Sequence, residues 1–236
     1  MVALSFHGLL LHQTIFAPDG LHFGFAYALS AMLWLGVMVY WLESLALALS
    51  ALPLLLLPLA GLCVVLPWMF PGSVGFVAAD SWGFRLHLVT AILAYSLLTI
   101  AALHAILMTA QERRLHQTPQ ISGGGVWARL LDALPPLLAM EKMLFRMLTL
   151  GFVLLTSTLL TGVLFAEVIW QRAFRFDHKT LFAMLSWLIF GALLLGRWQY
   201  GWRGRSALRW TLVGFVALIL AYVGSRFVLE VILHRV

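Results

Sequence analysis

The sequence is poor in the charged residues that cover soluble proteins. Only 10% of its 236 residues are charged, whereas 63% are hydrophobic, and the mean hydropathy is +0.99. A soluble domain is nearer half apolar and a quarter charged. The composition therefore excludes an ordinary soluble enzyme, a disordered chain and a nucleic-acid-binding domain.

Cysteine and acidic residues are scarce as well. The single cysteine, Cys63, excludes a disulfide framework and a thiolate-rich metal site, and we expect it to pack as a small apolar residue in a helix. The nine Asp and Glu residues are scattered, which argues against a hydrolase, and neither a Walker pattern nor a GxGxxG turn occurs. We therefore expect that the protein is not an enzyme.

The sequence contains many continuous apolar runs of about twenty residues. A helix of this length spans a bilayer. An outer-membrane barrel would show shorter, alternating segments. We predict an all-α fold, a polytopic transmembrane helical bundle that forms a single domain over residues 1–236. The predicted spans are residues 23–42, 46–70, 86–109, 147–168, 180–197 and 209–231.

Three further segments stand out along the chain. Residues 1–16 are apolar but too short to span a membrane, and they are predicted to be the tail of a helix whose beginning is missing. The second span contains three prolines, so we expect it to be kinked or broken. Residues 111–142 form the one long polar loop, in which 126–134 is amphipathic and is predicted to lie on the membrane surface.

The basic residues predict the orientation of the helices in the membrane. Nine Lys and Arg residues lie on the side that holds loops 111–142 and 198–208, and six lie on the side of loops 71–85 and 169–179. The richer side is expected to be cytoplasmic. The other two loops and both chain ends are then on the outer side.

Histidine is the residue type in this sequence that is best suited to bind a ligand or a metal. His22, His87 and His178 begin spans and His234 ends the last one, all on the predicted outer side. Neutral imidazole is a good axial ligand for haem iron, although histidine at a helix end is also a common interfacial residue. His104 lies about 25 Å from His87 along the helix, but no other span carries a matching pair, which argues against a two-haem core.

The loop before the fifth span combines aromatic and basic residues. Trp170, Phe174 and Phe176 offer ring faces to a flat macrocycle, and Arg175 and Lys179 offer cations to its propionates. An interfacial aromatic belt with positive flanks gives the same pattern. The residues of this loop leave both interpretations open.

Ionisable residues near the membrane are few. Arg226 lies four residues before Glu230, so the two can pair on one helix face, and Glu167 is a second partner for Arg226. An ionisable residue at membrane depth is a candidate functional residue, whereas a pair near the boundary is equally well explained by snorkelling.

Several short motifs follow one another in a fixed order. They are Asp19-Gly20-Leu21-His22-Phe23, His87 followed by Ala94-Tyr95, Leu160-Thr161-Gly162, Trp170 with the aromatic loop that ends at Asp177, and Gly201-Trp202-Arg203-Gly204. In this order and spacing the sequence resembles the cytochrome c assembly family of haem-handling membrane proteins (CcsA, CcmC and HemX types), in its YpjD-like branch. The resemblance covers residues 85–231 well and 7–45 weakly.

The resemblance implies a protein that binds or presents haem b near the outer membrane face, beside other cytochrome c maturation or haem-handling membrane proteins. A partner, and not this chain, would then make bonds. The implied haem-binding residues are His87 as axial ligand, His234 or His178 as second ligand, Trp170, Phe174, Phe176 and Asp177 as platform, and Arg175 and Lys179 for the propionates.

Departures from the family pattern favour an alternative. Phe174 and Phe176 replace tryptophans, and no histidine occurs late in the fifth span. The alternative is a membrane accessory or transport protein, for example one supporting cation export, which has kept the fold and lost haem. It would use Arg226, Glu230 and Glu167 around a polar cavity. The HemX side of the family also permits a regulator of haem synthesis enzymes.

Overall fold

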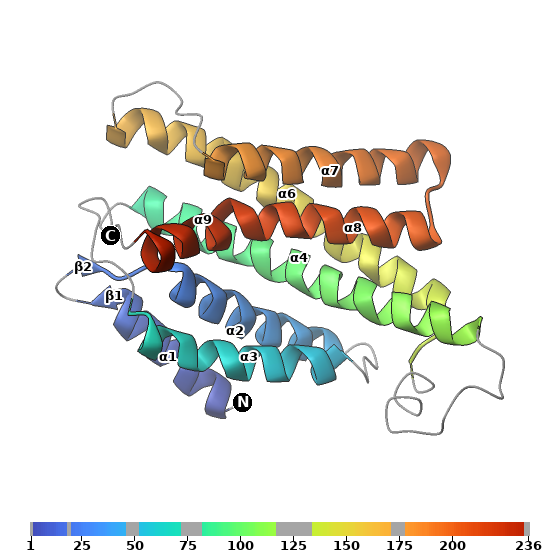
Figure 1. Cartoon of the computed structure of the whole chain (residues 1–236), viewed down its shortest axis with the longest axis horizontal. Coiled ribbons are helices and arrows are strands. Elements are labelled where there is room, and N and C mark those ends of the chain that lie inside the picture. Colours follow the sequence, from blue (N-terminus) through green and yellow to red (C-terminus); the bar gives the residue numbers. More distant parts are fainter. Residues whose placement is uncertain are drawn as a thin grey trace.

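The chain is described by a computed structural model over residues 2–17, 20–45, 52–71, 82–116, 134–170 and 178–233, with the side chains of 20–21 and 165–170 left aside. These residues are helical almost throughout, as predicted (Figure 1). The principal helices are α1 (Val2–Ile15), α2 (Phe25–Ser44), α3 (Leu52–Met69), α4 (Trp82–Leu115), α6 (Leu137–Trp170), α7 (His178–Tyr200) and α8 (Gly204–Ile219). The last helical run continues from α8 through η1 (Leu220–Gly224), α9 (Ser225–Phe227) and η2 (Val228–Ile232).

Six helices of the described residues are long and apolar enough to cross a membrane, and they correspond to the six predicted spans. The predicted boundaries of the third and fourth spans were too narrow, because α4 and α6 continue well into the predicted 111–142 loop. Apolar patterning ends near residue 110, but Gln, Glu and Arg are good helix formers and carry α4 on to Leu115. The predicted amphipathic stretch 126–134 lies almost wholly outside the described residues.

The proline-rich second span is an unbroken helix. α3 contains Pro58 and Pro67 in its interior and still runs from Leu52 to Met69. Of the two expectations, a kink or a break, the break is therefore wrong for the described part of this span, and the kink stays a prediction. Neighbouring helices and local adjustment make interior prolines tolerable in membrane helices.

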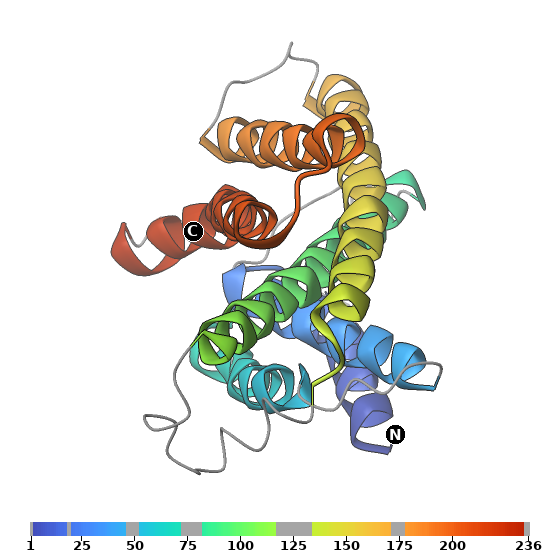
Figure 2. The same ribbon diagram turned by 90° about the vertical axis from the view of Figure 1, so that its right-hand side faces the viewer.

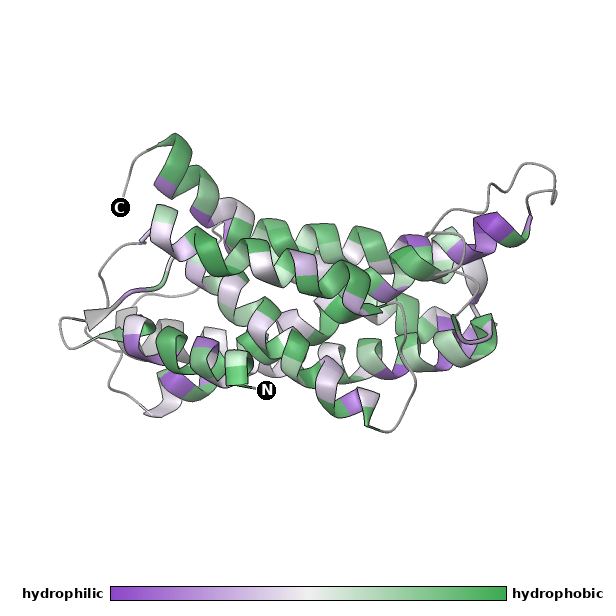
Figure 3. Ribbon diagram, turned by 90° about the horizontal axis from the view of Figure 1, so that it is seen from below, coloured by the Kyte–Doolittle hydropathy of each residue, from purple (hydrophilic) through white to green (hydrophobic). Residues whose placement is uncertain are grey.

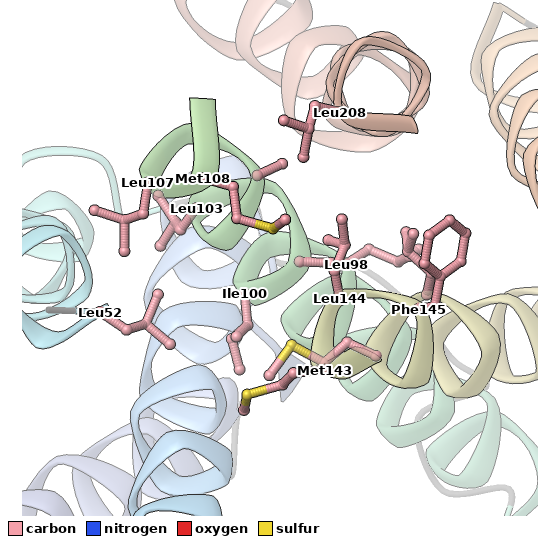
Figure 4. Close-up of a cluster of buried hydrophobic side chains, with 14 of the residues drawn as sticks. Leu52, Leu98, Ile100, Leu103, Leu107, Met108, Met143, Leu144, Phe145 and Leu208 are labelled. Carbon is pink, nitrogen blue, oxygen red and sulfur yellow. The ribbon is translucent and has the colours of Figure 1, made fainter. Parts of the chain in front are cut away.

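Helix α4 lies at the centre of the bundle. It packs against α2, α3, α6 and α8, and α7 packs in turn on α6 and α8; Figures 1 and 2 show α4 running between the α2–α3 pair and the α7–α8 pair. Leu98 and Ile100 of α4 and Leu144 of α6 are fully buried in the shared core (Figure 4). Fully buried alanines such as Ala101 and Ala105 let the helices approach closely.

The outward faces of the helices are apolar. Hydrophobic residues occupy most of the length of each helix, and hydrophilic residues lie mainly near the helix ends (Figure 3). On α3, Leu57, Leu62 and Val65 are more than half exposed. Such faces are stable against lipid, so the surface agrees with the predicted multi-pass membrane protein.

The short N-terminal segment is a helix that lies along α2. The Trp34 indole N–H donates to Leu4 O at 2.7 Å, and a Cβ on Gly8 would stand 2.5 Å from the Trp34 ring. His7 Nε2 lies 2.9 Å from Ser30 Oγ, and partial burial lowers the pKa of His7. A two-residue pairing of β1 (Phe16–Ala17) with β2 (Gly20–Leu21) then turns the chain into α2.

A glycine-flanked turn joins α7 to α8. Gly201 and Gly204 have φ angles of 65° and 56°, which favour glycine. The Trp202 ring covers Gly196, and Arg197 donates to Trp202 O at 3.2 Å while it pairs with Glu141 of α6. The Gly-Trp-x-Gly motif therefore has a structural role at this end of the bundle.

Gly196→Ala is expected to destabilise the protein by about 1–3 kcal/mol, because the new Cβ would stand 2.5 Å from the Trp202 ring. Gly61→Ala is the matched control, since Gly61 is an exposed helical glycine with open space around its Cβ among the described residues; its stability should be unchanged or raised by up to about 1 kcal/mol. Thermal unfolding in detergent measures both. Equal melting temperatures for the two variants would contradict this packing.

Candidate functional site

A cavity of about 780 Å³ lies among α2, α4, α6, α7 and the C-terminal helical run. Its walls are mostly apolar, and its volume falls in the range of small-molecule and cofactor sites. Aromatic side chains contribute much of the lining. These are Phe23, Phe84, Tyr95, Trp187 and Tyr222.

His87 is the imidazole in the wall of this cavity. Its Nδ1 lies 2.8 Å from Thr161 Oγ1, and Thr161 Oγ1 also donates to Ser157 O at 2.8 Å. A carbonyl can only accept, so this arrangement directs the single hydroxyl proton to Ser157 and favours donation from the His87 Nδ1–H to Thr161. The ring lone pair is then on Nε2, and a hydrogen bond to the other nitrogen is how proteins orient a metal-binding histidine.

Gly162 keeps the space beside the imidazole open. It lines the cavity, and a Cβ at this position would stand 3.5 Å from His87 Cε1. The Thr161-Gly162 pair therefore has two roles, because the threonine holds the histidine ring and the glycine leaves room next to it. The pair belongs to the Leu160-Thr161-Gly162 motif, whose role the sequence alone did not indicate.

Two cations line the same cavity from different helices. Lys179 is the second residue of α7, and Arg226 lies in α9. Arg226 Nη1 is 3.8 Å from Glu230 Oε1, so the predicted ion pair exists. His87, Lys179 and Arg226 therefore line one cavity, and the predicted propionate contact of Lys179 stays a prediction.

The other predicted site residues have different outcomes. His178 begins α7 and is exposed; among the described residues that line the cavity, the one imidazole is that of His87. Several predicted residues fall outside the described residues. These are Phe174, Arg175, Phe176, Asp177 and His234, and the side chains of Trp170 and Glu167.

His104 has a structural role. It is buried in the core, where its Nε2 lies 3.1 Å from Met140 O of α6. It does not line the cavity, which agrees with the argument against a two-haem core. Across the described ranges no three His, Cys, Asp or Glu side chains gather as a metal site, and Cys63 is a buried thiol, as expected.

The residues that shape the cavity were largely missed by sequence reasoning. Trp187 donates its indole N–H to Thr156 Oγ1 at 2.9 Å and stacks on Phe152 with ring centroids 5.7 Å apart. The Tyr95 hydroxyl donates to Leu218 O at 3.0 Å. In a membrane helix, lipid and an apolar cavity select the same residue types, so periodicity could not single these residues out.

The described residues thus form a helical bundle of a polytopic membrane protein, with an apolar, histidine-bearing cavity as a candidate ligand site. The model of the family described as Cytochrome C assembly protein matches residues 1–233, and the chain belongs to this family. The family resemblance seen in the motifs is thereby confirmed.

Several curated proteins are similar to this chain. An uncharacterised 28.8 kDa protein in the nifR3-like 5′ region of Azospirillum brasilense is 34% identical over 218 residues, covering 87% of this chain and 76% of that protein. The inner membrane protein YpjD of Escherichia coli K12 is 31% identical over 150 residues, 64% of this chain and 53% of YpjD. The cytochrome c biogenesis protein CcsA of Prochlorococcus marinus AS9601 is 29% identical over 191 residues, which cover 75% of this chain and 62% of CcsA.

The matched regions are partial for two of these relatives. This chain spans about half the length of YpjD and 62% of CcsA. No solved structure matches it.

Proposed function

We propose that this protein binds haem in the cavity beside His87 and presents it, as cargo, for cytochrome c assembly. The observation that carries the proposal is the His87 imidazole in the wall of a mostly apolar cavity of about 780 Å³. Family membership and the similarity to a CcsA cytochrome c biogenesis protein support it.

The chemistry of the described residues fits haem. Imidazole is a common axial ligand, aromatic and aliphatic walls suit the macrocycle, and Lys179 suits a propionate. The bound haem would supply the iron and its redox chemistry, and the protein would supply binding and orientation. We infer that the chain itself makes no bonds and that a partner completes the assembly reaction.

We propose further residues for the haem site beside those that line this cavity. His178 is next to Lys179, at the start of α7, and the loop before it carries the aromatic platform and Arg175. We propose His234 or His178 as the second ligand, and haem b as the form bound. Haem titration of His234 and His178 variants tests these two proposed ligands in the same way as it tests His87.

We also propose the orientation of the protein in an inner membrane, a location supported by its similarity to YpjD, which is named an inner membrane protein. The side with more basic residues, including loops 111–142 and 198–208, is assigned to the cytoplasm. His87, Lys179 and Arg226 then lie toward the outer face, because each is near the outer end of its span.

Thr161→Val is expected to weaken haem binding by about 10–100-fold, because valine keeps the shape but cannot accept the His87 Nδ1–H. Thr161→Ser should restore most of the affinity. Thr149→Val is the control, since Thr149 donates to Phe145 O of its own helix and does not line the cavity. Haem titration followed at the Soret band measures all three. Equal affinities for wild type and Thr161→Val would remove Thr161 from the site.

A further inference from the structure

Within the described part of the chain, the charge of Arg226 in the cavity wall is only partly compensated. The side chain is 17% exposed, and the nearest described carboxylate oxygen, Glu230 Oε1, is 3.8 Å away, which is beyond hydrogen-bond distance. Arg226 Nε and Glu230 Oε1 are both buried without a hydrogen-bond partner in the described part of the chain. A partly buried guanidinium of this kind favours a carboxylate that can accept its N–H groups.

Glu230 is held by a different helix. Its Oε2 lies 3.4 Å from the backbone N of Phe25, the first residue of α2, where the positive end of the helix favours an anion. A Cβ on Gly24 would stand 2.7 Å from Glu230 Oε2, so glycine leaves the room that this carboxylate occupies. The position of Glu230 is therefore set by the start of α2 and by its own helix, and Arg226 remains directed at the cavity.

Tyr222 and Lys179 line the same cavity as Arg226. Its guanidinium also interacts with the Tyr222 hydroxyl, one turn earlier on the same helical run, and both residues line the cavity. Lys179 lines the cavity from α7. A ligand in this cavity thus meets cations from two helices and apolar side chains elsewhere.

We propose that Arg226 binds a carboxylate of the cavity ligand, a haem propionate, and that Glu230, which contacts the start of α2, only partly neutralises Arg226 and competes with that carboxylate for it. This inference rests on the proposed function, because it takes haem as the ligand. Arginine suits the role since its planar fork matches a carboxylate with two parallel hydrogen bonds. The site therefore binds haem more tightly than it binds porphyrins whose propionates are esterified.

The test compares haem with haem dimethyl ester, which keeps the iron and macrocycle and lacks both carboxylate charges. Both are titrated into the detergent-purified full chain, as wild type, Arg226→Gln and the control Arg209→Gln, which changes an exposed arginine of α8 outside the cavity. We expect Arg226→Gln to bind haem about tenfold more weakly than wild type does. The variant and wild type should bind the ester with equal affinity. Arg209→Gln should match wild type for both ligands.

The outcomes separate this inference from the proposed function. If wild type binds neither haem nor its ester, the proposed function is wrong and this inference falls with it. If wild type binds both and Arg226→Gln matches it for haem, or loses both ligands equally, only the role of Arg226 is overturned.

A second variant keeps the test sharp if Arg226→Gln does not fold. Glu230→Gln preserves the shape of the side chain and removes the charge that competes with a ligand carboxylate for Arg226. We expect it to bind haem severalfold more tightly, with unchanged affinity for the ester. Unchanged or weaker haem binding by Glu230→Gln would overturn the inference.

Discussion

Replacing His87 by glycine is expected to weaken haem binding by about 100-fold or more, and added imidazole is expected to restore it. The imidazole of His87 lines the cavity and is oriented by Thr161, so its loss removes the axial ligand while leaving a space that free imidazole fits. Haem titration of the purified variant, with and without imidazole, measures the effect. The rescue shows a ligand role, which a loss of stability would not produce.

His116→Gly is the control for this prediction. His116 follows the end of α4, is exposed and contacts only the backbone of its own helix among the interactions described, Glu112 O at 2.8 Å. It should bind haem as wild type does. Full haem affinity in His87→Gly without imidazole would exclude His87 as an axial ligand.

Filling the cavity beside His87 is the second change with a large expected effect. Gly162→Leu should lower haem affinity by about 10–100-fold, because the added side chain occupies the space next to the imidazole. Gly162→Ala is its graded partner, since a single Cβ would make an ordinary 3.5 Å contact with His87 Cε1. It should retain haem binding.

Haem titration and thermal unfolding of the two Gly162 variants are measured together. The leucine variant should remain folded, because the change adds atoms to a cavity and not to the packed core. Wild-type haem affinity in a folded Gly162→Leu protein would place haem elsewhere in the molecule.

The helices of this fold were predictable because each depends on a local property, a long apolar run. Their ends were less so. α4 continues to Leu115 and α6 begins at Leu137, because a helix needs helix-forming residues and not an apolar environment to extend past the membrane. Apolar runs mark the part of a helix inside the bilayer and say little about the rest.

The candidate site was predictable only in part, where polar residues stood out against an apolar background. His87 and Lys179 were singled out in this way and both line the cavity, whereas His178 was singled out and does not. Trp187 and Tyr222 were not singled out, because a cavity wall and a lipid-facing surface call for the same side chains. The contact of Glu230 with the start of α2 joins residues 205 positions apart, so no local pattern could indicate it.

Glycine shows the same limit. Gly162 and Gly196 sit inside helices, where a sequence pattern treats them as weak points. The structure shows the Trp202 ring closely packed on Gly196, and cavity space with the His87 imidazole at ordinary contact distance beside Gly162. Close approach between distant segments is the property that single-sequence reasoning could not supply.

The most direct test of the central claim is an absorption spectrum of the detergent-purified protein with haem added, recorded oxidised and then reduced with dithionite. Haem held by His87 and a second strong ligand predicts a Soret band with sharp α and β bands on reduction. A featureless spectrum, even with haem in excess, would contradict the claim and favour an accessory or transport role for the cavity that Arg226 lines.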